Sequence, residues 1–176
     1  MHRYLPWLLG GVAVAVAAIV LAPLFGGGSF TTGPQGLAGQ AAAVFSLQDD
    51  RGAGVSLAQY RNRIVVMNLW ASWCPPCREE LPDLQRLANR YSHGNIVVVG
   101  VNEGESPQRA RSFAASLRIR FPIWVDSSER YGRIYAALGL PTTIVLNRRG
   151  VIVRGYDGAL TFDQMQSAVD AALRNS

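Results

Sequence analysis

The sequence predicts one α/β domain with a mixed central sheet that helices cover on both faces. Two nearly continuous apolar runs, Ile64–Trp70 and Asn95–Val101, are typical of strands buried on both faces, and they alternate with helical patterns. Near the end of the chain, Thr142–Asn147 and Val151–Tyr156 flank a short Arg-Arg-Gly turn and predict an antiparallel hairpin. Alternation in the middle and a hairpin near the end together indicate parallel and antiparallel strands in one sheet.

The other elements follow from local signals along the chain. Two short alternating segments around an acidic, Gly-containing turn predict an N-terminal β-hairpin, and apolar positions at helical spacing predict four helices. The predicted elements are a hairpin of Phe45–Leu47 and Val55–Leu57, a helix over Pro75–Tyr91 kinked at Pro82, a helix over Pro107–Leu117 capped by Ser106, an edge-like strand within Phe121–Asp126, and helices over Glu129–Leu138 and Thr161–Arg174.

Residues 1–25 predict a signal anchor with one transmembrane helix. Leu5–Phe25 carries no charge over 21 residues, which at about 1.5 Å per residue can cross a hydrocarbon core of about 30 Å. Arg3 precedes this run and no charged residue follows it until Asp49, so the positive-inside rule places the N-terminus in the cytoplasm. We therefore expect a single-pass protein of the cell (inner) membrane with a periplasmic or other extracytoplasmic domain.

A cleaved signal peptide is the competing interpretation of the same segment. Ala22 could end a cleavable segment, but Pro23 would follow the cut, and the apolar run is long for a signal peptide. Both interpretations export the domain. Residues 26–42 are uncharged and rich in Gly, Ser and Thr, so they predict a flexible linker, and the folded domain is expected over residues 43–176.

Composition narrows the class of protein. An apolar fraction of 49% suffices for a core, and the net charge of +5 comes entirely from arginines that are scattered along the chain. Scattered basic residues argue against a nucleic-acid interface, although they suit an anionic membrane surface. The only two cysteines, Cys74 and Cys77, exclude a scaffold of several disulfides. With His2 and His93 they cannot plausibly form one zinc cage, so the pair is expected to act alone.

The cysteines lie where a reactive pair is expected. Trp70 ends a predicted buried strand, and Cys74 follows at the start of a helix, where the dipole and free N–H groups favour the thiolate. Cys77, one turn further on, is placed to resolve a mixed disulfide. Pro75 and Pro76 cost little in a first helical turn and stiffen the loop. The spacing therefore predicts thiol–disulfide exchange, with Cys74 attacking and Cys77 resolving.

Several neighbours have both a functional and a structural interpretation. Glu80 shares a helix face with Cys77 and is either a buried base for its proton or a solvated surface carboxylate. Trp73 either covers the pair or packs in the core, and Asn68 either hydrogen-bonds near the site or satisfies local backbone. Leu140–Pro141 opens a strand; the residues alone favour an ordinary trans proline there, although a cis bond would suit pairing with an extended substrate.

These motifs resemble the thioredoxin superfamily. "NLWASWCPPCREELP" and "GLPTTIVLNRRGVIV" are similar to its membrane-anchored, extracytoplasmic TlpA/ResA branch, which includes the DsbE/CcmG-type cytochrome c maturation proteins. The resemblance covers Phe45–Ser176 and implies a thioredoxin-like fold with the N-terminal hairpin and a central βα insertion within Val97–Asp126. Thr142 stands where cytochrome-specific members usually carry Glu, which favours the broader TlpA/ResA type.

The resemblance also implies roles for individual residues. Cys74 would be the exposed nucleophile, Cys77 the resolving thiol, and Pro141 a cis-proline facing them. Glu80 would substitute for the buried Asp of thioredoxins, whose place Asn68 takes here, and Glu105 would lie at the rim of the site or simply on the surface. We expect substrate to contact Trp73, Pro75, Pro76, Leu140 and Thr142.

The function implied is a membrane-tethered extracytoplasmic thiol–disulfide oxidoreductase. By resemblance it is a reductant of disulfides in exported proteins, such as the haem-binding cysteines of apocytochrome c, and it receives electrons from a membrane thiol carrier of the CcdA/DsbD type. No cofactor is required, because the cysteine pair stores the electrons. Two alternatives remain open: a disulfide-donating oxidase of the same fold, and a Cu(I)-binding metallochaperone module. A peroxidase would have a Pro- and Thr-rich segment before a single reactive cysteine, and "LWASWC" is not such a segment.

Overall fold

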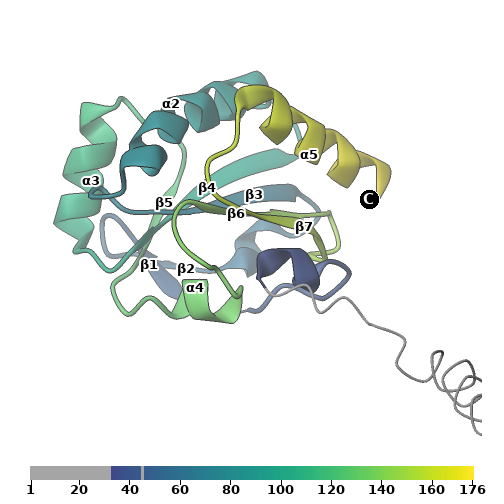
Figure 1. Ribbon diagram of the computed structural model, residues 1–176, viewed down its shortest axis with the longest axis horizontal. Coiled ribbons are helices and arrows are strands. Elements are labelled where there is room, and N and C mark those ends of the chain that lie inside the picture. Colours follow the sequence, from purple (N-terminus) through teal and green to yellow (C-terminus); the bar gives the residue numbers. More distant parts are fainter. Residues whose placement is uncertain (1–32, 45) are drawn as a thin grey trace, which may run out of the picture. The chain divides into compact units, whose positions relative to one another are not determined.

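The computed structural model describes residues 33–44 and 46–176 (Figure 1). The predicted anchor, residues 1–25, and the first part of the predicted linker lie outside the described residues. Within the described ranges, no helix combines the length and the apolar character that a membrane crossing needs.

Seven strands form one mixed sheet in the order β2-β1-β5-β4-β3-β6-β7. The three parallel strands β3, β4 and β5 lie in the middle, β6 and β1 pair antiparallel on either side of them, and β7 and β2 lie at the two edges. The strands are β1 (Leu47–Asp49), β2 (Gly54–Val55), β3 (Ile64–Trp70), β4 (Ile96–Glu103), β5 (Ile123–Asp126), β6 (Thr142–Leu146) and β7 (Ile152–Asp157). The predicted α/β class and mixed sheet are therefore confirmed.

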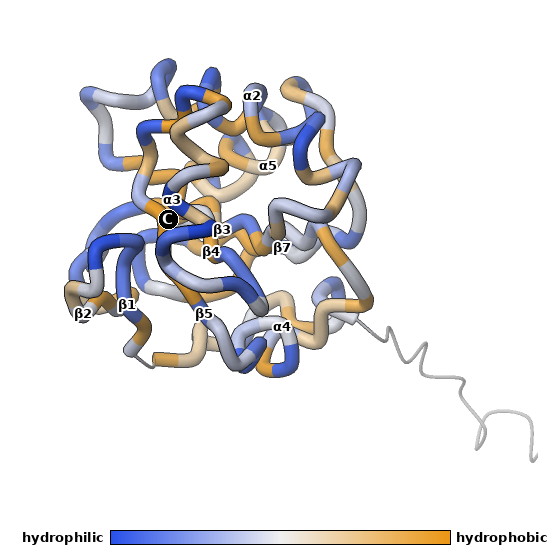
Figure 2. The backbone as a smooth tube through the Cα atoms, turned by 90° about the vertical axis from the view of Figure 1, so that its left-hand side faces the viewer, coloured by the Kyte–Doolittle hydropathy of each residue, from blue (hydrophilic) through white to orange (hydrophobic). Residues whose placement is uncertain are grey.

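The helices cover both faces of the sheet. Helices α2 (Pro75–Arg90), α3 (Pro107–Ser116) and α5 (Phe162–Arg174) lie on one face, and α4 (Arg130–Ile134) lies on the other (Figure 1). Short 3₁₀ turns at Pro34–Leu37 and Leu57–Tyr60 also contribute apolar side chains to the α4 face. Hydrophilic colour in Figure 2 gathers mainly in the peripheral loops, and the central strands carry much of the hydrophobic colour.

Strand β3 lies at the centre of the core. All seven of its residues are buried, because helices cover both of its faces. Its side chains alternate between the two apolar clusters: Val66 and Trp70 face α2 and α5, whereas Met67 and Leu69 face α4. Gly100 on β4 leaves room for Trp70, since a Cβ there would lie 2.8 Å from the indole nitrogen.

The start of α3 follows the predicted cap, whereas α4 ends at Ile134 and not at the predicted Leu138. Ser106 accepts a hydrogen bond from Arg109 N–H at the start of α3, and Thr161 forms a capping box with Gln164 at the start of α5. Pro82 lies inside α2, as the sequence requires.

Three strands differ from prediction. The strand expected at an edge, β5, lies inside the sheet between β4 and β1, and all four of its residues are buried. The reason is the N-terminal hairpin, which pairs with β5 through Gln48 and Asp49 and extends the sheet beyond it. The first strand of that hairpin is Leu47–Asp49, later than predicted, and Leu57 begins a 3₁₀ turn instead of continuing the second strand.

Residues 33–42, which the sequence assigns to the linker, contact the folded domain. Gly39 N–H donates to Ile152 O at 2.8 Å, Ile152 N–H donates to Gln40 O at 2.9 Å, and Ala41 bridges to Val151. We call residues 33–42 the strap. Gly155 on β7 leaves room for it, because a Cβ there would lie 2.5 Å from Pro34 atoms. The packing depends on a glycine more than a hundred residues away, so the local composition of the strap could not indicate it.

Candidate active site

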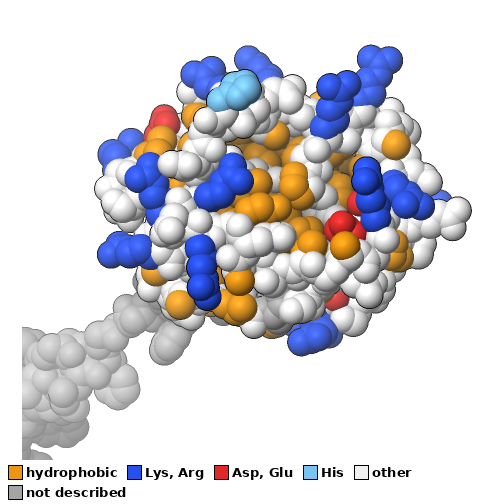
Figure 3. Space-filling model, turned by 180° about the vertical axis from the view of Figure 1, so that it is seen from behind, with side chains coloured by type: hydrophobic (Ala, Val, Ile, Leu, Met, Phe, Trp, Pro, Cys, Tyr) orange, Lys and Arg blue, Asp and Glu red, His pale blue; other side chains and the backbone are white. Residues whose placement is uncertain are grey.

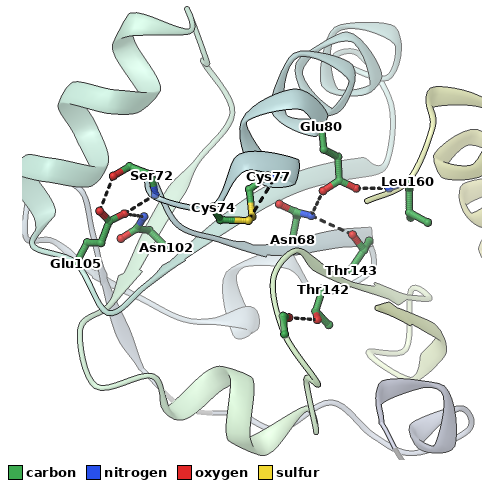
Figure 4. Close-up of a disulfide and its surroundings, with 11 residues drawn as sticks. Asn68, Ser72, Cys74, Cys77, Glu80, Asn102, Glu105, Thr142, Thr143 and Leu160 are labelled. Carbon is green, nitrogen blue, oxygen red and sulfur yellow. Dashed lines mark hydrogen bonds between the residues drawn. A yellow bond between two sulfur atoms is a disulfide. The ribbon is translucent and has the colours of Figure 1, made fainter. Parts of the chain in front are cut away.

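The two cysteines form a disulfide at the start of α2, as Figure 4 shows. Cys74 is the N-cap residue, and Cys77 N–H donates to its sulfur at 3.2 Å. Pro75 and Pro76 occupy the first two helical positions and have no N–H, so Cys77 supplies the first amide that the helix can offer. That amide and the helix dipole favour negative charge on the Cys74 sulfur when the disulfide is open.

The exposure of Cys74 differs from the expectation. Only 2% of the surface of Cys74 is exposed, and Cys77 is fully buried. The helix start turns the Cys74 sulfur inward to meet Cys77, and both residues join the apolar cluster beneath α2. The exposed surface beside the disulfide belongs instead to Trp73, which is 65% exposed, and to Pro75 and Pro76. Trp73 is therefore neither a core residue nor a full cover over the pair.

Glu80 is buried one helical turn after Cys77, with 2% of its surface exposed. Its Oε2 accepts a hydrogen bond from Asn68 Nδ2 at 3.0 Å, and its Oε1 accepts one from Leu160 N–H at 2.8 Å. The surface interpretation of Glu80 is therefore wrong. Asn68, the polar residue in β3, reaches the site rather than local backbone, and its Nδ2 also donates to Thr143 Oγ1 at 3.0 Å.

The electrostatics of Glu80 suit a proton acceptor. Burial raises its pKa to about 7, although the hydrogen bonds from Leu160 and Asn68 oppose the rise. Such a carboxylate can take up and release a proton near neutral pH. The position of Glu80 on the same helix face as Cys77 makes that thiol the natural proton donor.

Glu105 braces the loop that leads to Cys74. It accepts hydrogen bonds from Ser72 N–H at 2.7 Å, Ser72 Oγ at 2.6 Å and Asn102 Nδ2 at 2.7 Å (Figure 4). Arg109 Nε lies 3.5 Å from Glu105 Oε1. Burial alone would raise the pKa of Glu105, but these hydrogen bonds and the Arg109 charge outweigh it and hold the pKa below its ordinary value. The side chain is thus a structural anchor at the rim of the site.

We expect Glu105→Ala to destabilise the fold by about 3 kcal/mol, because Ser72 and Asn102 would lose a charged acceptor in a partly buried place. Chemical unfolding of the oxidised protein measures this change. Glu79→Ala is the matched control, since Glu79 is an exposed carboxylate on α2 and its loss should change stability by less than about 0.5 kcal/mol. Equal losses in the two variants would contradict the bracing role.

The Leu140–Pro141 peptide bond is cis, as the family resemblance implied. Leu140 is half-buried and packs against the cluster that holds both cysteines. Thr142, expected to contact substrate, is fully buried, and its hydroxyl donates to Gly139 O at 2.7 Å, with Asp157 Oδ1 a second acceptor 3.1 Å away. Its side chain therefore stabilises the loop that contains the cis bond and does not face substrate.

Sequence reasoning missed two groups near the site. Leu160 N–H reaches Glu80 from the loop before α5, and no local pattern could have revealed a backbone donor eighty residues away in sequence. Glu103, at the end of β4, is buried, and burial raises its pKa to about 7. It lines a pocket of about 200 Å³ together with Leu140. The sequence did contain a signal for Glu103, because a carboxylate closely follows the apolar run of β4.

A Cu(I) metallochaperone usually adds a His or Met ligand to its two cysteines. Among residues 33–44 and 46–176, no group of three His, Cys, Asp or Glu side chains is placed to hold a metal ion. Met67 lies in the cluster on the opposite face of the sheet from the cysteines.

Arginine side chains are spread over the face shown in Figure 3 and form no single stripe of the kind that nucleic-acid binding uses.

Comparison with known proteins gives consistent matches. The model of the AhpC/TSA family matches residues 38–154. The chain is 28% identical to thiol-disulfide oxidoreductase ResA of Halalkalibacterium halodurans, over 89% of each chain. It is 32% identical to ResA of Bacillus subtilis, over 70% of this chain and 69% of that protein. A crystal structure from Chlorobium tepidum, described as a thiol:disulfide interchange protein DsbE, matches with a TM-score of 0.71 and 28% identity, over 77% of this chain and 97% of that one.

Proposed function

The chain belongs to the AhpC/TSA family of thioredoxin-like proteins and is a thiol–disulfide oxidoreductase of the ResA/DsbE type, and from this we propose that it reduces disulfides in exported proteins. The observation that carries the proposal is one arrangement: a disulfide at the start of α2, with a backbone N–H on the Cys74 sulfur and a buried Glu80 one turn beyond Cys77.

The reduced pair would act in two steps. The Cys74 thiolate attacks a substrate disulfide, so that a Cys74–substrate disulfide forms and one substrate thiolate leaves. Cys77 then gives its proton to Glu80, attacks the Cys74 sulfur and expels the second substrate thiolate. Two electrons pass to the substrate, and the enzyme ends with the Cys74–Cys77 disulfide that the structure contains. No further cofactor is needed for this exchange.

The surface around the disulfide suits an extended polypeptide. Trp73, Pro75 and Pro76 are exposed on one side, and the loop at Leu140–Pro141 packs against the same apolar cluster. Exposed apolar and aromatic groups beside the disulfide suit a protein substrate, because aromatic side chains are enriched at protein–protein interfaces. We propose apocytochrome c haem-binding cysteines as the substrate class, because the sequence motifs resemble the TlpA/ResA branch, which includes cytochrome c maturation proteins.

The electron donor and location complete the proposal. A membrane thiol carrier of the CcdA/DsbD type would return the disulfide to the dithiol. The uncharged run Leu5–Phe25 supports a single-pass anchor in the cell (inner) membrane, with the N-terminus in the cytoplasm and the domain outside. Spheroplast proteolysis tests the location: the domain should be digested from the outside, and full protection would contradict it.

The reduction potential of the cysteine pair tests the direction of electron flow. We expect the full chain, equilibrated with dithiothreitol or glutathione buffers, to give a value near or below that of thioredoxin, about −270 mV. A value near that of the strong oxidants, about −120 mV, would overturn the reductase assignment and favour the disulfide-donating oxidase. A double Cys74→Ser/Cys77→Ser chain is the control and should show no redox transition.

A further inference from the structure

The side-chain amide of Asn68 is held in one orientation. Its Nδ2 donates both hydrogens, to Glu80 Oε2 at 3.0 Å and to Thr143 Oγ1 at 3.0 Å. An ionised carboxylate can only accept, so the nitrogen rather than the oxygen must face Glu80. Thr143 is the cross-strand partner of Asn68 in the β3–β6 pair, which fixes the second bond by the register of the sheet. The amide oxygen is left to point elsewhere.

That oxygen points toward the cysteines. Asn68 lies between Val66 and Trp70 on the strand face that packs against both sulfurs. Figure 4 shows its amide between the disulfide and Glu80, with the nitrogen on the Glu80 side and the oxygen on the side of the sulfurs. Cys77 precedes Glu80 by one helical turn on the same face of α2, which makes its sulfur the candidate partner of this oxygen.

In the disulfide form this oxygen has no hydrogen-bond partner among the residues that the structure describes. Asn68 is fully buried, and its Oδ1 accepts no bond from any residue that the structure describes. An unpaired buried acceptor carries a cost, and native proteins usually satisfy such groups. A disulfide cannot donate a hydrogen bond, whereas the thiol produced by reduction can. The acceptor is therefore placed for a donor that exists only in the reduced protein.

We propose that Asn68 is a redox-dependent positioning residue, whose Oδ1 accepts a hydrogen bond from the Cys77 thiol in the reduced protein. The proposal rests on the proposed function and adds to it the residue that holds the resolving thiol. Reduction adds two electrons and one proton to the pair, giving the Cys74 thiolate and the Cys77 thiol, and that proton lies against Asn68 Oδ1. When the mixed disulfide forms, the proton passes to Glu80, and the Cys77 sulfur attacks Cys74.

The hydrogen bond also affects the redox equilibrium. It stabilises the reduced state alone, so it makes the disulfide easier to reduce. Asn68→Leu keeps a similar side-chain size and removes the acceptor. We expect it to lower the equilibrium constant for reduction by dithiothreitol about three- to tenfold, equivalent to about 15 to 30 mV toward more negative potential. The comparison is made at pH 8, where the Glu80 carboxylate is ionised and holds the amide nitrogen towards itself.

The S–H stretching band of Cys77 gives the direct test. The chain has only two cysteines, so Cys74→Ser leaves one S–H group, and serine is itself a good N-cap. In this full-length background, Asn68→Leu should move the infrared band to higher wavenumber, because the thiol loses its acceptor. Asn68→Asp retains an oxygen at that place and should restore the lower wavenumber. An unmoved band in Asn68→Leu would overturn the proposal.

Two further variants keep the result interpretable. If Asn68→Leu fails to fold, Thr143→Val releases one side of the amide clamp without touching Asn68, and the band should then shift part of the way; no shift would overturn the proposal. In a Cys77→Ser background, at a pH low enough to protonate Cys74, the Cys74 S–H band should not move in Asn68→Leu, and a shift there would reverse the assignment. If the wild-type chain does not exchange disulfides while the band still moves, the proposed function fails and the hydrogen bond stands.

Discussion

Cys77→Ser is expected to stop turnover and to leave the protein joined to its substrate by a disulfide. Cys74 can still attack, because its position at the start of α2 and the N–H of residue 77 do not depend on the second sulfur. Without the resolving thiol, the mixed disulfide cannot be released. We expect multiple-turnover reduction of a protein disulfide to fall by on the order of a thousandfold or more, the scale for loss of a nucleophile.

Non-reducing electrophoresis and mass spectrometry distinguish the two cysteines. Cys74→Ser should lose turnover to a similar extent but should form no adduct, since the attacking sulfur is gone. A stable adduct on Cys74→Ser, with none on Cys77→Ser, would mean that the two roles are exchanged. The nearly complete burial of both residues makes this test more informative than solvent exposure, which does not separate them.

The oxidised protein is expected to lose stability as the pH rises from about 5 to about 8. Burial raises the pKa of Glu80 from 4.5 to about 7, so the folded state binds this proton more tightly than the unfolded chain does. The contribution of Glu80 to stability is therefore greatest below about pH 4.5. It decreases as the pH rises, until Glu80 has ionised in the folded protein. A shift of that size corresponds to about 3 kcal/mol. Burial of Glu103 acts in the same direction.

Urea unfolding of the disulfide form at several pH values measures this slope without interference from thiol titration. Glu80→Gln should remove the contribution of Glu80 to the pH dependence of the unfolding free energy and so reduce its slope. Glu103→Gln should remove the contribution of Glu103. Glutamine offers one acceptor oxygen to the two donors from Asn68 and Leu160, so only the slope, and not the absolute stability, is diagnostic. An unchanged slope in Glu80→Gln would mean that this carboxyl is ionised throughout.

The same variant addresses catalysis. Glu80→Gln cannot take up the Cys77 proton, so resolution of the mixed disulfide should slow near pH 7 while attack by Cys74 remains. Rapid-mixing experiments that follow release of the second substrate thiol measure the step. If neither this rate nor the thiol titrations change, Glu80 does not act as the base.

Local sequence was sufficient for the parts of the site that lie on one element. The apolar run of β3 and the cysteine spacing on α2 placed the disulfide correctly, because each depends on a few neighbouring residues. The burial of Glu80 could not be decided from spacing, since it depends on Leu160 and Asn68 arriving from other elements. The buried side chain of Thr142 was missed for the same reason: its partner Asp157 lies on the next strand.

Strand order shows the same limit. The four residues of β5 form a short apolar segment, and such a segment fits an edge or an interior strand equally well. What decides is whether another strand pairs with its far side, and the N-terminal hairpin that does so lies more than seventy residues earlier. The cis bond before Pro141 was likewise available only from the resemblance.

The strap at residues 33–42 has a consequence for self-association. An unpaired outer strand invites pairing with another copy of the chain, and β7 is such a strand. The strap occupies the main-chain groups at the start of β7, and Pro34 packs against Gly155 further along it. The opposite edge, β2, is only two residues long. A fragment that begins at Ala43, the boundary the sequence indicates, would uncover β7 and should aggregate more readily than one that begins at Gly33.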